Sequence, residues 1–220
     1  MTRRNTDDLI RTLAAKADPV RLLPGPVIRA TEWLTCSLLY VGFVILVLTP
    51  RADLAAKLTD ARFVIEAATA LATGIVAAIA AFATVVPASN RTTLSLVVLP
   101  LAAWVGSLGV GCIQDWITLG SAGRLWQVDW SCFPAILVTG VVPTIAMAIM
   151  LRRGAPLTPA LSMTLGGLAA GALADFGLRF HHREAGVMTL VWHLGAACVL
   201  LVTAGRAGRY VLKWPVASQG

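Results

Sequence analysis

The sequence predicts an all-α, polytopic membrane protein: a bundle of six transmembrane helices preceded by a short cytosolic helix. Apolar residues make up 57% of its 220 residues, charged residues only 13%, and the mean hydropathy is +0.77. These values lie outside the range of soluble globular domains. Six apolar stretches each come close to the roughly 20 residues that a helix needs to cross about 30 Å of hydrocarbon. They are residues 32–49, 64–86, 93–111, 132–151, 158–178 and 188–205.

The predicted spans divide the chain into three parts. Residues 1–31 form a polar segment, residues 32–205 form the transmembrane domain, and residues 206–220 form a basic tail. The first segment is too short for a soluble enzyme domain, so we expect a protein that is not an enzyme. Its length and mixed charge also argue against a cleaved signal peptide, because such a peptide has only a short basic region before its apolar core.

The distribution of Lys and Arg predicts the orientation, because cytosolic connections carry more of these residues. One side of the predicted bundle has twelve and the other has six. The twelve are Arg3, Arg4, Arg11, Lys16, Arg21, Arg29, Arg91, Arg152, Arg153, Arg206, Arg209 and Lys213, and the six are Arg51, Lys57, Arg62, Arg124, Arg179 and Arg183. Both termini are therefore expected in the cytosol. The net charge of +7 mostly reflects this topology, so it does not indicate nucleic-acid binding.

A short helix is predicted within the first segment. Thr6 can serve as its N-cap, with the carboxylates of Asp7 and Asp8 at the positive end of the helix dipole. Asp18 and Pro19 should end the helix, because the residue before a proline avoids helical backbone angles.

This predicted helix carries an apolar stripe. Leu9, Leu13 and Ala17 recur at helical spacing, with Ile10 and Ala14 beside them. Nothing nearby in the sequence can bury these side chains. Two interpretations stay open: the helix lies on the lipid surface, or it docks into a groove of a soluble partner.

Two carboxylates fall inside predicted spans, where ionisable residues are costly and often functional. Glu66 lies one turn from Arg62, which predicts an ion pair near the membrane interface. Asp175 can pair with Arg179 one turn on, or it can polarise the histidines beyond it. The same span holds glycines at a spacing that favours close helix contact. They are Gly166, Gly167, Gly171 and Gly177.

Cysteine and histidine residues gather near the predicted outer face. Cys112 ends the third span and Cys132 begins the fourth. His181 and His182 lie in the last outer loop, and His193 follows about a turn into the sixth span. Three interpretations are open: thiols that are oxidised or form a disulfide, a site for zinc or copper, or side chains that only pack or face solvent.

The sequence contains no CxxC, no HExxH and no phosphate-binding glycine loop. The two remaining cysteines, Cys36 and Cys198, fall inside predicted spans. We expect them to be small buried side chains.

Several short motifs follow one another along almost the whole chain. They are residues 6–15 (TDDLIRTLAA), 18–24 (DPVRLLP), 132–134 (CFP), 151–157 (LRRGAPL), 166–174 (GGLAAGALA), His181, Trp192 and 205–209 (GRAGR). Each motif is modest alone. Their order on this topology resembles the NrsF-type proteins of proteobacteria, which are negative regulators of sigma factor F with six predicted spans.

The resemblance implies a membrane-bound anti-sigma factor in the bacterial inner membrane. Its cytosolic segment would hold an extracytoplasmic-function sigma factor and release it under metal or oxidative stress sensed at the periplasmic face. The implied partners are this sigma factor and the lipid bilayer, without direct contact to nucleic acid. No cofactor is implied beyond a metal ion acting as a signal. With the apolar stripe, the resemblance assigns sigma binding to Asp7, Asp8, Leu9, Ile10, Arg11 and Leu13.

The chain departs from the family at the outer face, where sensing is associated with two cysteines. One position corresponds to Cys132, but the other, which follows His181, is His182 in this chain. A disulfide between those two positions cannot form here. Either Cys132 acts with Cys112, or His182 supplies a metal ligand together with His181 and Cys132, or the sensing has changed.

Two other classes of function stay open. The chain could be a small membrane oxidoreductase, or a metal-binding or transport protein, that uses the Cys/His set directly. The vicinal cysteine pair expected for thiol exchange is missing from the sequence. A structural subunit of an assembly would account for the glycine-rich span, but it leaves the N-terminal helix without a role.

Overall fold

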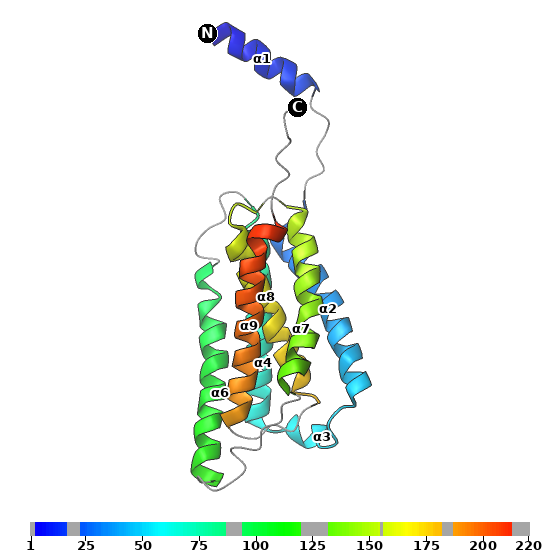
Figure 1. Cartoon of the computed structure of the whole chain (residues 1–220), viewed down its shortest axis with the longest axis vertical. Helices are drawn as coiled ribbons and strands as arrows, with labels where there is room; N and C mark the ends of the chain where they lie inside the picture. The colour runs from blue at the N-terminus through cyan, green and yellow to red at the C-terminus, as the bar shows by residue number, and fades with distance from the viewer. Residues whose placement is uncertain are drawn as a thin grey trace.

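The computed structural model describes residues 3–16, 23–86, 94–119, 132–154, 156–181 and 187–212, and within these ranges it contains helices and no β-strand. Six long helices of the described chain run alternately up and down in one bundle (Figure 1). They are α2 (Pro26–Leu48), α4 (Ala61–Ala83), α6 (Val98–Leu119), α7 (Cys132–Arg152), α8 (Pro159–Leu178) and α9 (Val187–Val211). Two shorter helices are α1 (Arg3–Lys16) and α3 (Leu54–Lys57). The predicted all-α class is confirmed.

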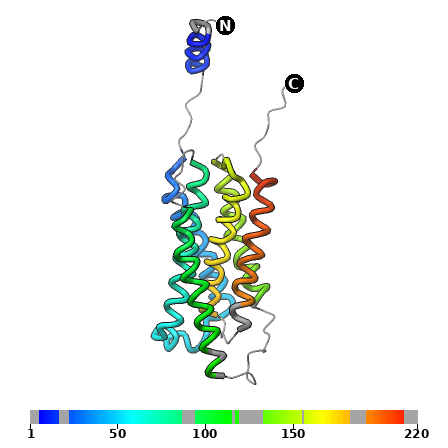
Figure 2. The backbone as a smooth tube through the Cα atoms, turned by 90° about the vertical axis from the view of Figure 1, so that its left-hand side faces the viewer, coloured from blue at the N-terminus to red at the C-terminus, as the bar shows by residue number. Residues whose placement is uncertain are grey.

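The bundle has two ends, which Figure 2 shows from the side. We call the end where α2 begins and α9 finishes the near end, and the opposite end, which carries α3, the far end (Figure 1). The helix α1 stands beyond the near end, apart from the bundle (Figure 1).

Five of the described helices are long and apolar enough to cross a bilayer, which indicates a membrane protein. They are α2, α4, α8, and the segments Phe133–Arg152 of α7 and Val191–Val211 of α9. The apolar part of α6, Val98–Gln114, is shorter than these five. Helices of sufficient length therefore occur at five of the six predicted spans, and the crossing by α6 stays a prediction.

The helix α8 lies at the centre of the bundle and packs against α9, α4, α7 and α2. Its small side chains allow neighbouring backbones to come close. A Cβ atom on Gly167 would lie 2.7 Å from the carbonyl oxygen of Leu200 in α9, and one on Gly171 would lie 3.1 Å from the Cα of Ala197. The packing role predicted for these glycines is confirmed.

The helix α2 begins at Pro26, earlier than the predicted span that started at residue 32. Proline suits the first position of a helix, because its ring fixes φ near the helical value and no hydrogen bond is lost there. Arg29 then continues the helix without facing lipid. Its guanidinium donates a hydrogen bond to the carbonyl oxygen of Met150 and lies 4.6 Å from the centre of the Phe82 ring.

The prediction that Cys36 and Cys198 are buried is wrong. Both side chains are exposed on the outside of the bundle and carry free thiols. The outer surface of a membrane bundle is itself apolar, because lipid covers it, so an apolar residue in a span does not have to face the protein core.

Candidate functional site

A network of charged side chains lies buried in the far half of the bundle. Its central residue is Arg179, which follows α8 and is 0% exposed. Arg179 Nη1 donates to Glu66 Oε2 of α4 at 2.6 Å, and Arg179 Nε donates to Asp175 Oδ2 at 3.1 Å. One guanidinium thus joins carboxylates from two different helices. Such a planar group can donate to two acceptors in a fixed geometry.

The network extends in both directions from these three residues. Arg62 Nε donates to the second oxygen of Glu66, at 3.0 Å. On the other side, Nδ1 of His193 in α9 contacts the second oxygen of Asp175. The contacts therefore run from Arg62 through Glu66, Arg179 and Asp175 to His193, and they link α4, α8 and α9.

Burial separates one member from the other four. The side chains of Glu66, Asp175, Arg179 and His193 are between 0% and 5% exposed, whereas that of Arg62 is 40% exposed. Charges away from water have a large desolvation cost, which is offset only when their hydrogen bonds are well formed. The network thus brings four buried ionisable side chains into contact within a core that consists mainly of apolar side chains.

The sequence predicted two of these contacts. Glu66 pairs with Arg62 and Asp175 pairs with Arg179, as the spacing of four residues indicated, and Asp175 also contacts a histidine. The cross-helix pair between Glu66 and Arg179 was missed. The two residues are 113 positions apart, and no local pattern connects them.

The loops at the far end tie α2 to α8. Nδ1 of His181 donates to the carbonyl oxygen of Thr49 at 2.6 Å, and the backbone N–H of Arg51 donates to the carbonyl oxygen of Phe180 at 2.9 Å. His181 therefore orders the end of α2. No group of three or more potential metal-binding side chains occurs among the residues that the structure describes. His182, which the sequence proposes as a ligand, lies outside these residues.

Asp60 begins α4 at the same end. Its side chain accepts a hydrogen bond from the backbone N–H of Arg62 at 3.1 Å and another from Lys57 Nζ at 2.8 Å. The bond from Lys57, followed by its positive charge and the backbone donors, lowers the pKa of Asp60 below its usual value. An ionised Asp60 therefore caps the helix that carries Glu66.

The two cysteines of the predicted redox pair both belong to the far half of the bundle. Cys112 is half-buried in α6 and carries a free thiol. Cys132 is the first residue of α7, and its side chain lies outside the described part of the structure. The next residue, Phe133, packs against Trp192 of α9 with ring centres 5.5 Å apart. The start of α7 is therefore close to the residue before His193.

The apolar stripe on α1 is exposed. Leu9, Ile10 and Leu13 are 57%, 58% and 61% exposed, and Asp7, Asp8 and Arg11, also predicted to bind sigma factor, are exposed as well. The predicted N-cap is wrong, because α1 already begins at Arg3 and Thr6 lies inside it. Residues 3–5 contain neither glycine nor proline, so nothing prevents the helix from starting there.

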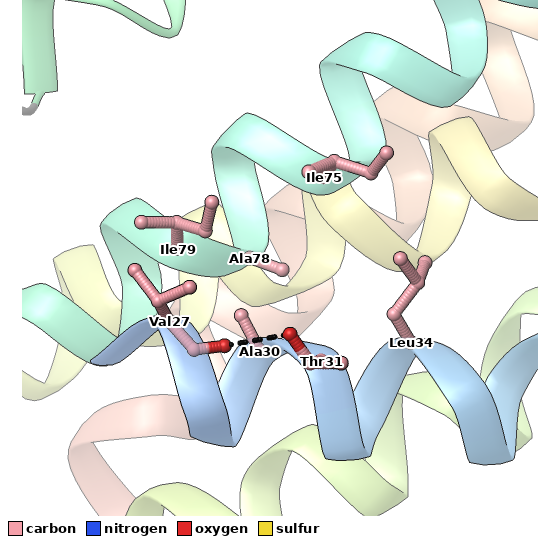
Figure 3. Close-up of a pocket in the computed structure, with 7 residues that line it drawn as sticks. All are labelled: Val27, Ala30, Thr31, Leu34, Ile75, Ala78 and Ile79. Atoms are coloured by element: carbon pink, nitrogen blue, oxygen red, sulfur yellow. Dashed lines mark hydrogen bonds between the residues drawn. The ribbon is translucent and has the colours of Figure 1, made fainter. Parts of the chain in front are cut away.

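A small groove lies between α2 and α4, close to the end of the bundle where α2 begins (Figure 3). Its lining is Val27, Ala30, Thr31, Leu34, Ile75, Ala78 and Ile79. The Thr31 hydroxyl donates to the carbonyl oxygen of Val27 at 3.0 Å, within its own helix. The volume of about 30 Å³ is far below the roughly 300–1,000 Å³ of ordinary small-molecule sites. This groove is too small and too apolar to be a substrate site.

Fold and side chains together define a helical membrane protein with a buried ion network and an exposed amphipathic helix at one end. The family model described as "NrsF: Negative regulator of sigma F" matches residues 13–214. Because this match covers nearly the whole chain, the protein belongs to the NrsF family of negative regulators of a sigma factor. No curated protein and no solved structure matches the chain.

Proposed function

We propose that this chain is a membrane-bound anti-sigma factor of the bacterial inner membrane, which holds an extracytoplasmic-function sigma factor away from RNA polymerase. The observation that carries the proposal is the exposed apolar stripe of α1 in a member of a family of sigma-factor regulators. Leu9 and Ile10 of the stripe precede the matched region, and Leu13 is its first residue.

The docking surface consists of Leu9, Ile10 and Leu13, with charged residues around it that set the register. Burying one such side chain contributes about 1.5–3 kcal/mol before the costs of association are subtracted. A helix that places apolar side chains at this spacing fits the groove-binding mode of recognition. The flanking charges are those of Asp7, Asp8 and Arg11.

In this proposal the bundle crosses the membrane six times, with α6 as the third span. The near end faces the cytosol and the far end faces the periplasm, because the sequence assigns twelve Lys and Arg residues to the side of the near end and six to the side of the far end. The helix α1 is then on the side where a sigma factor is found.

The far end is the proposed sensor for oxidants or heavy metals. Cys132 is its reactive thiol, acting with Cys112, or with His181 and His182 as a metal-binding set. A signal at this end changes sigma affinity at the other only if the bundle has two arrangements with different affinities.

The test is a pull-down of the tagged full-length protein from membranes in mild detergent, with mass spectrometry of the bound proteins. The wild type should retain a sigma factor. The double variant Leu9→Asp, Leu13→Asp should reduce its affinity about 100-fold or more, because two apolar contacts are lost and two charges are desolvated.

The matched control is Thr12→Asp, Ala15→Asp. It adds the same two charges to the same helix but leaves the side chains of Leu9, Ile10 and Leu13 in place, and it should retain the sigma factor. Equal retention by all three proteins, or no sigma factor with any of them, would contradict the proposal. Treating the membranes with an oxidant or with zinc before the pull-down should release the sigma factor from the wild type and not from Cys132→Ser.

A further inference from the structure

Two sequence motifs meet at the near end of the bundle, and the proposed function gives neither of them a partner. Residues 151–157 (LRRGAPL) begin in the last turn of α7, and residues 205–209 (GRAGR) lie near the end of α9. The helices α7 and α9 pack against each other, and both run from the far end to the near end (Figure 1). Their motifs therefore lie on neighbouring helices at the same end.

The glycines of both motifs pack against the bundle. A Cβ atom on Gly208 would lie 2.5 Å from the carbonyl oxygen of Pro159 in α8, and one on Gly205 would overlap a side chain of the same helix. A Cβ atom on Gly154 would overlap the side chain of Val85. Close packing on the glycines thus fixes which face of each motif is turned inward.

The arginines of both motifs are turned outward. Arg152 and Arg153 are exposed at the end of α7, and Arg206 and Arg209 are exposed about one turn apart on α9. Among the residues that the structure describes, none of these four forms an ion pair. The carboxylate that the described bundle has at this end is that of Glu32 in α2. The arginine surface therefore suits an anionic partner by charge complementarity.

The same two helices expose apolar side chains directly next to the arginines, toward the middle of the bundle. They include Ile145 and Ile149 of α7 and Val202 of α9. Tyr210 is also exposed, with its ring centre 5.2 Å from the guanidinium carbon of Arg209. Tyrosine is common at the level of lipid headgroups. Positive charge at this level, continued by an apolar surface toward the bilayer centre, is the chemistry that an anionic phospholipid requires.

We propose that Arg152, Arg153, Arg206 and Arg209 bind the headgroup of an anionic phospholipid whose acyl chains lie along α7 and α9. A guanidinium matches the geometry of a phosphate group, to which it can donate two hydrogen bonds. An acidic protein surface would use the arginines but would leave the adjoining apolar face without a role. This property depends on the bundle lying in a membrane and is separate from sigma binding by α1.

The test measures lipid binding to the purified full-length protein in mild detergent by native mass spectrometry. Anionic phosphatidylglycerol is compared with phosphatidylcholine, which has no net charge and is used with the same acyl chains. The wild type should bind phosphatidylglycerol about tenfold or more tightly than phosphatidylcholine, because each basic side chain at an anionic surface corresponds to about fivefold in affinity. The double variant Arg206→Gln, Arg209→Gln should lose most of this preference.

The matched control is Arg124→Gln, Arg183→Gln, which removes the same two charges from the connections after α6 and α8. It should keep the preference of the wild type. Two further measurements use the wild type alone and therefore do not depend on how a variant folds. Ammonium acetate at about 1 M should weaken the preference, because salt screens exposed charges. Glycerol phosphate, which has the phosphate without acyl chains, should not displace the lipid.

Equal binding of both lipids by the wild type would overturn the proposal, as would an unchanged preference in Arg206→Gln, Arg209→Gln. Displacement by glycerol phosphate would also overturn it, because the surface would then be a site for free phosphate. If Arg206→Gln, Arg209→Gln kept its lipid preference but lost the sigma factor in the pull-down, the surface would belong to the protein partner instead. The lipid measurement contains no sigma factor, so its failure and that of the proposed function are distinguishable.

Discussion

Arg179 is the residue on which the buried network depends. It is 0% exposed and donates to Glu66 and Asp175, which belong to different helices. Replacing a buried ion pair with apolar groups can be neutral for stability, but removing one partner alone leaves an uncompensated charge and costs about 3–5 kcal/mol. The network therefore acts as a unit, and each member is sensitive to loss of its neighbour.

We predict that Arg179→Met strongly lowers the free energy of unfolding, by about 3–5 kcal/mol, because Glu66 and Asp175 then face each other without a cation between them. Adding Glu66→Gln and Asp175→Asn should restore part of this loss, since both buried carboxylate charges are removed. Thermal unfolding in mild detergent would measure both effects.

The control for this prediction is Lys57→Gln at the exposed pair with Asp60, whose side chains are 39% and 37% exposed. Exposed pairs contribute about 0–1 kcal/mol, so this variant should unfold close to the wild type. An Arg179→Met protein as stable as Lys57→Gln would show that the network contributes nothing to the bundle.

Two of the four contacts in the buried network could be predicted from the sequence. The pairs Arg62–Glu66 and Asp175–Arg179 each lie four residues apart on a helix, so the helical repeat alone brings them together. The contacts of Arg179 with Glu66 and of His193 with Asp175 join different helices. They depend on which helix faces which, and nothing in the local spacing contains that information.

The close contact between α8 and α9 depends on glycine residues, which have no side chain. A Cβ on Gly167 would come within 2.7 Å of the Leu200 carbonyl oxygen and 2.9 Å of the Ala204 Cβ. Backbone atoms cannot move aside as a flexible side chain can, so the helices would have to separate. In a membrane, where water does not drive helices together, close packing of this kind is a main source of association.

We predict that Gly167→Ala lowers the unfolding free energy by about 1–3 kcal/mol, the usual cost of overpacking. The matched control is Gly106→Ala in α6, where a Cβ would meet nothing within 4 Å. It should be neutral or stabilising by up to about 1 kcal/mol, because alanine favours a helix. The same melting experiment compares the two, and a Gly167→Ala protein as stable as Gly106→Ala would contradict the close contact.

The ends of the helices were less predictable than their centres. Hydropathy excluded Arg29 from the first span, but the structure includes it in α2. Its guanidinium is stabilised there by the Phe82 ring and by a hydrogen bond to the carbonyl oxygen of Met150. At the other end of the chain, α9 continues to Val211 through Arg206 and Arg209, past the predicted end at residue 205. A hydropathy scale assigns each residue one value, whereas burial of a charge depends on its partners.

The arrangement of the bundle in the membrane makes a prediction about access from outside the cell. Single cysteines are introduced into a variant without native cysteines, and intact cells are treated with a small thiol reagent that passes the outer membrane through its pores but does not cross the inner membrane. Thr59→Cys, next to α3 at the far end, should be labelled, because this end is proposed to face the periplasm. Gln114→Cys, in the far part of α6, should also be labelled if α6 crosses the bilayer.

The controls are Ser95→Cys, which precedes α6 at the near end, and Leu9→Cys on α1. Neither should react until the cells are opened. Labelling of Leu9→Cys in intact cells would show that the orientation is the opposite of the proposed one and that α1 is not in the compartment of the sigma factor. Labelling of Ser95→Cys and Gln114→Cys from the same side would show that α6 does not cross.

Composition and the lengths of the apolar stretches were sufficient to predict a helical membrane protein with an exposed N-terminal helix, and ordered motifs were sufficient to predict its family. These properties can be predicted from residues close together in the sequence, because a short stretch is enough to determine helical periodicity and the free energy of transfer into lipid. Three features depended on the fold: the central place of α8, the exposure of Cys36 and Cys198, and the network through Arg179. Each of them depends on which helices are neighbours in the bundle, and contacts between segments far apart in the sequence determine this.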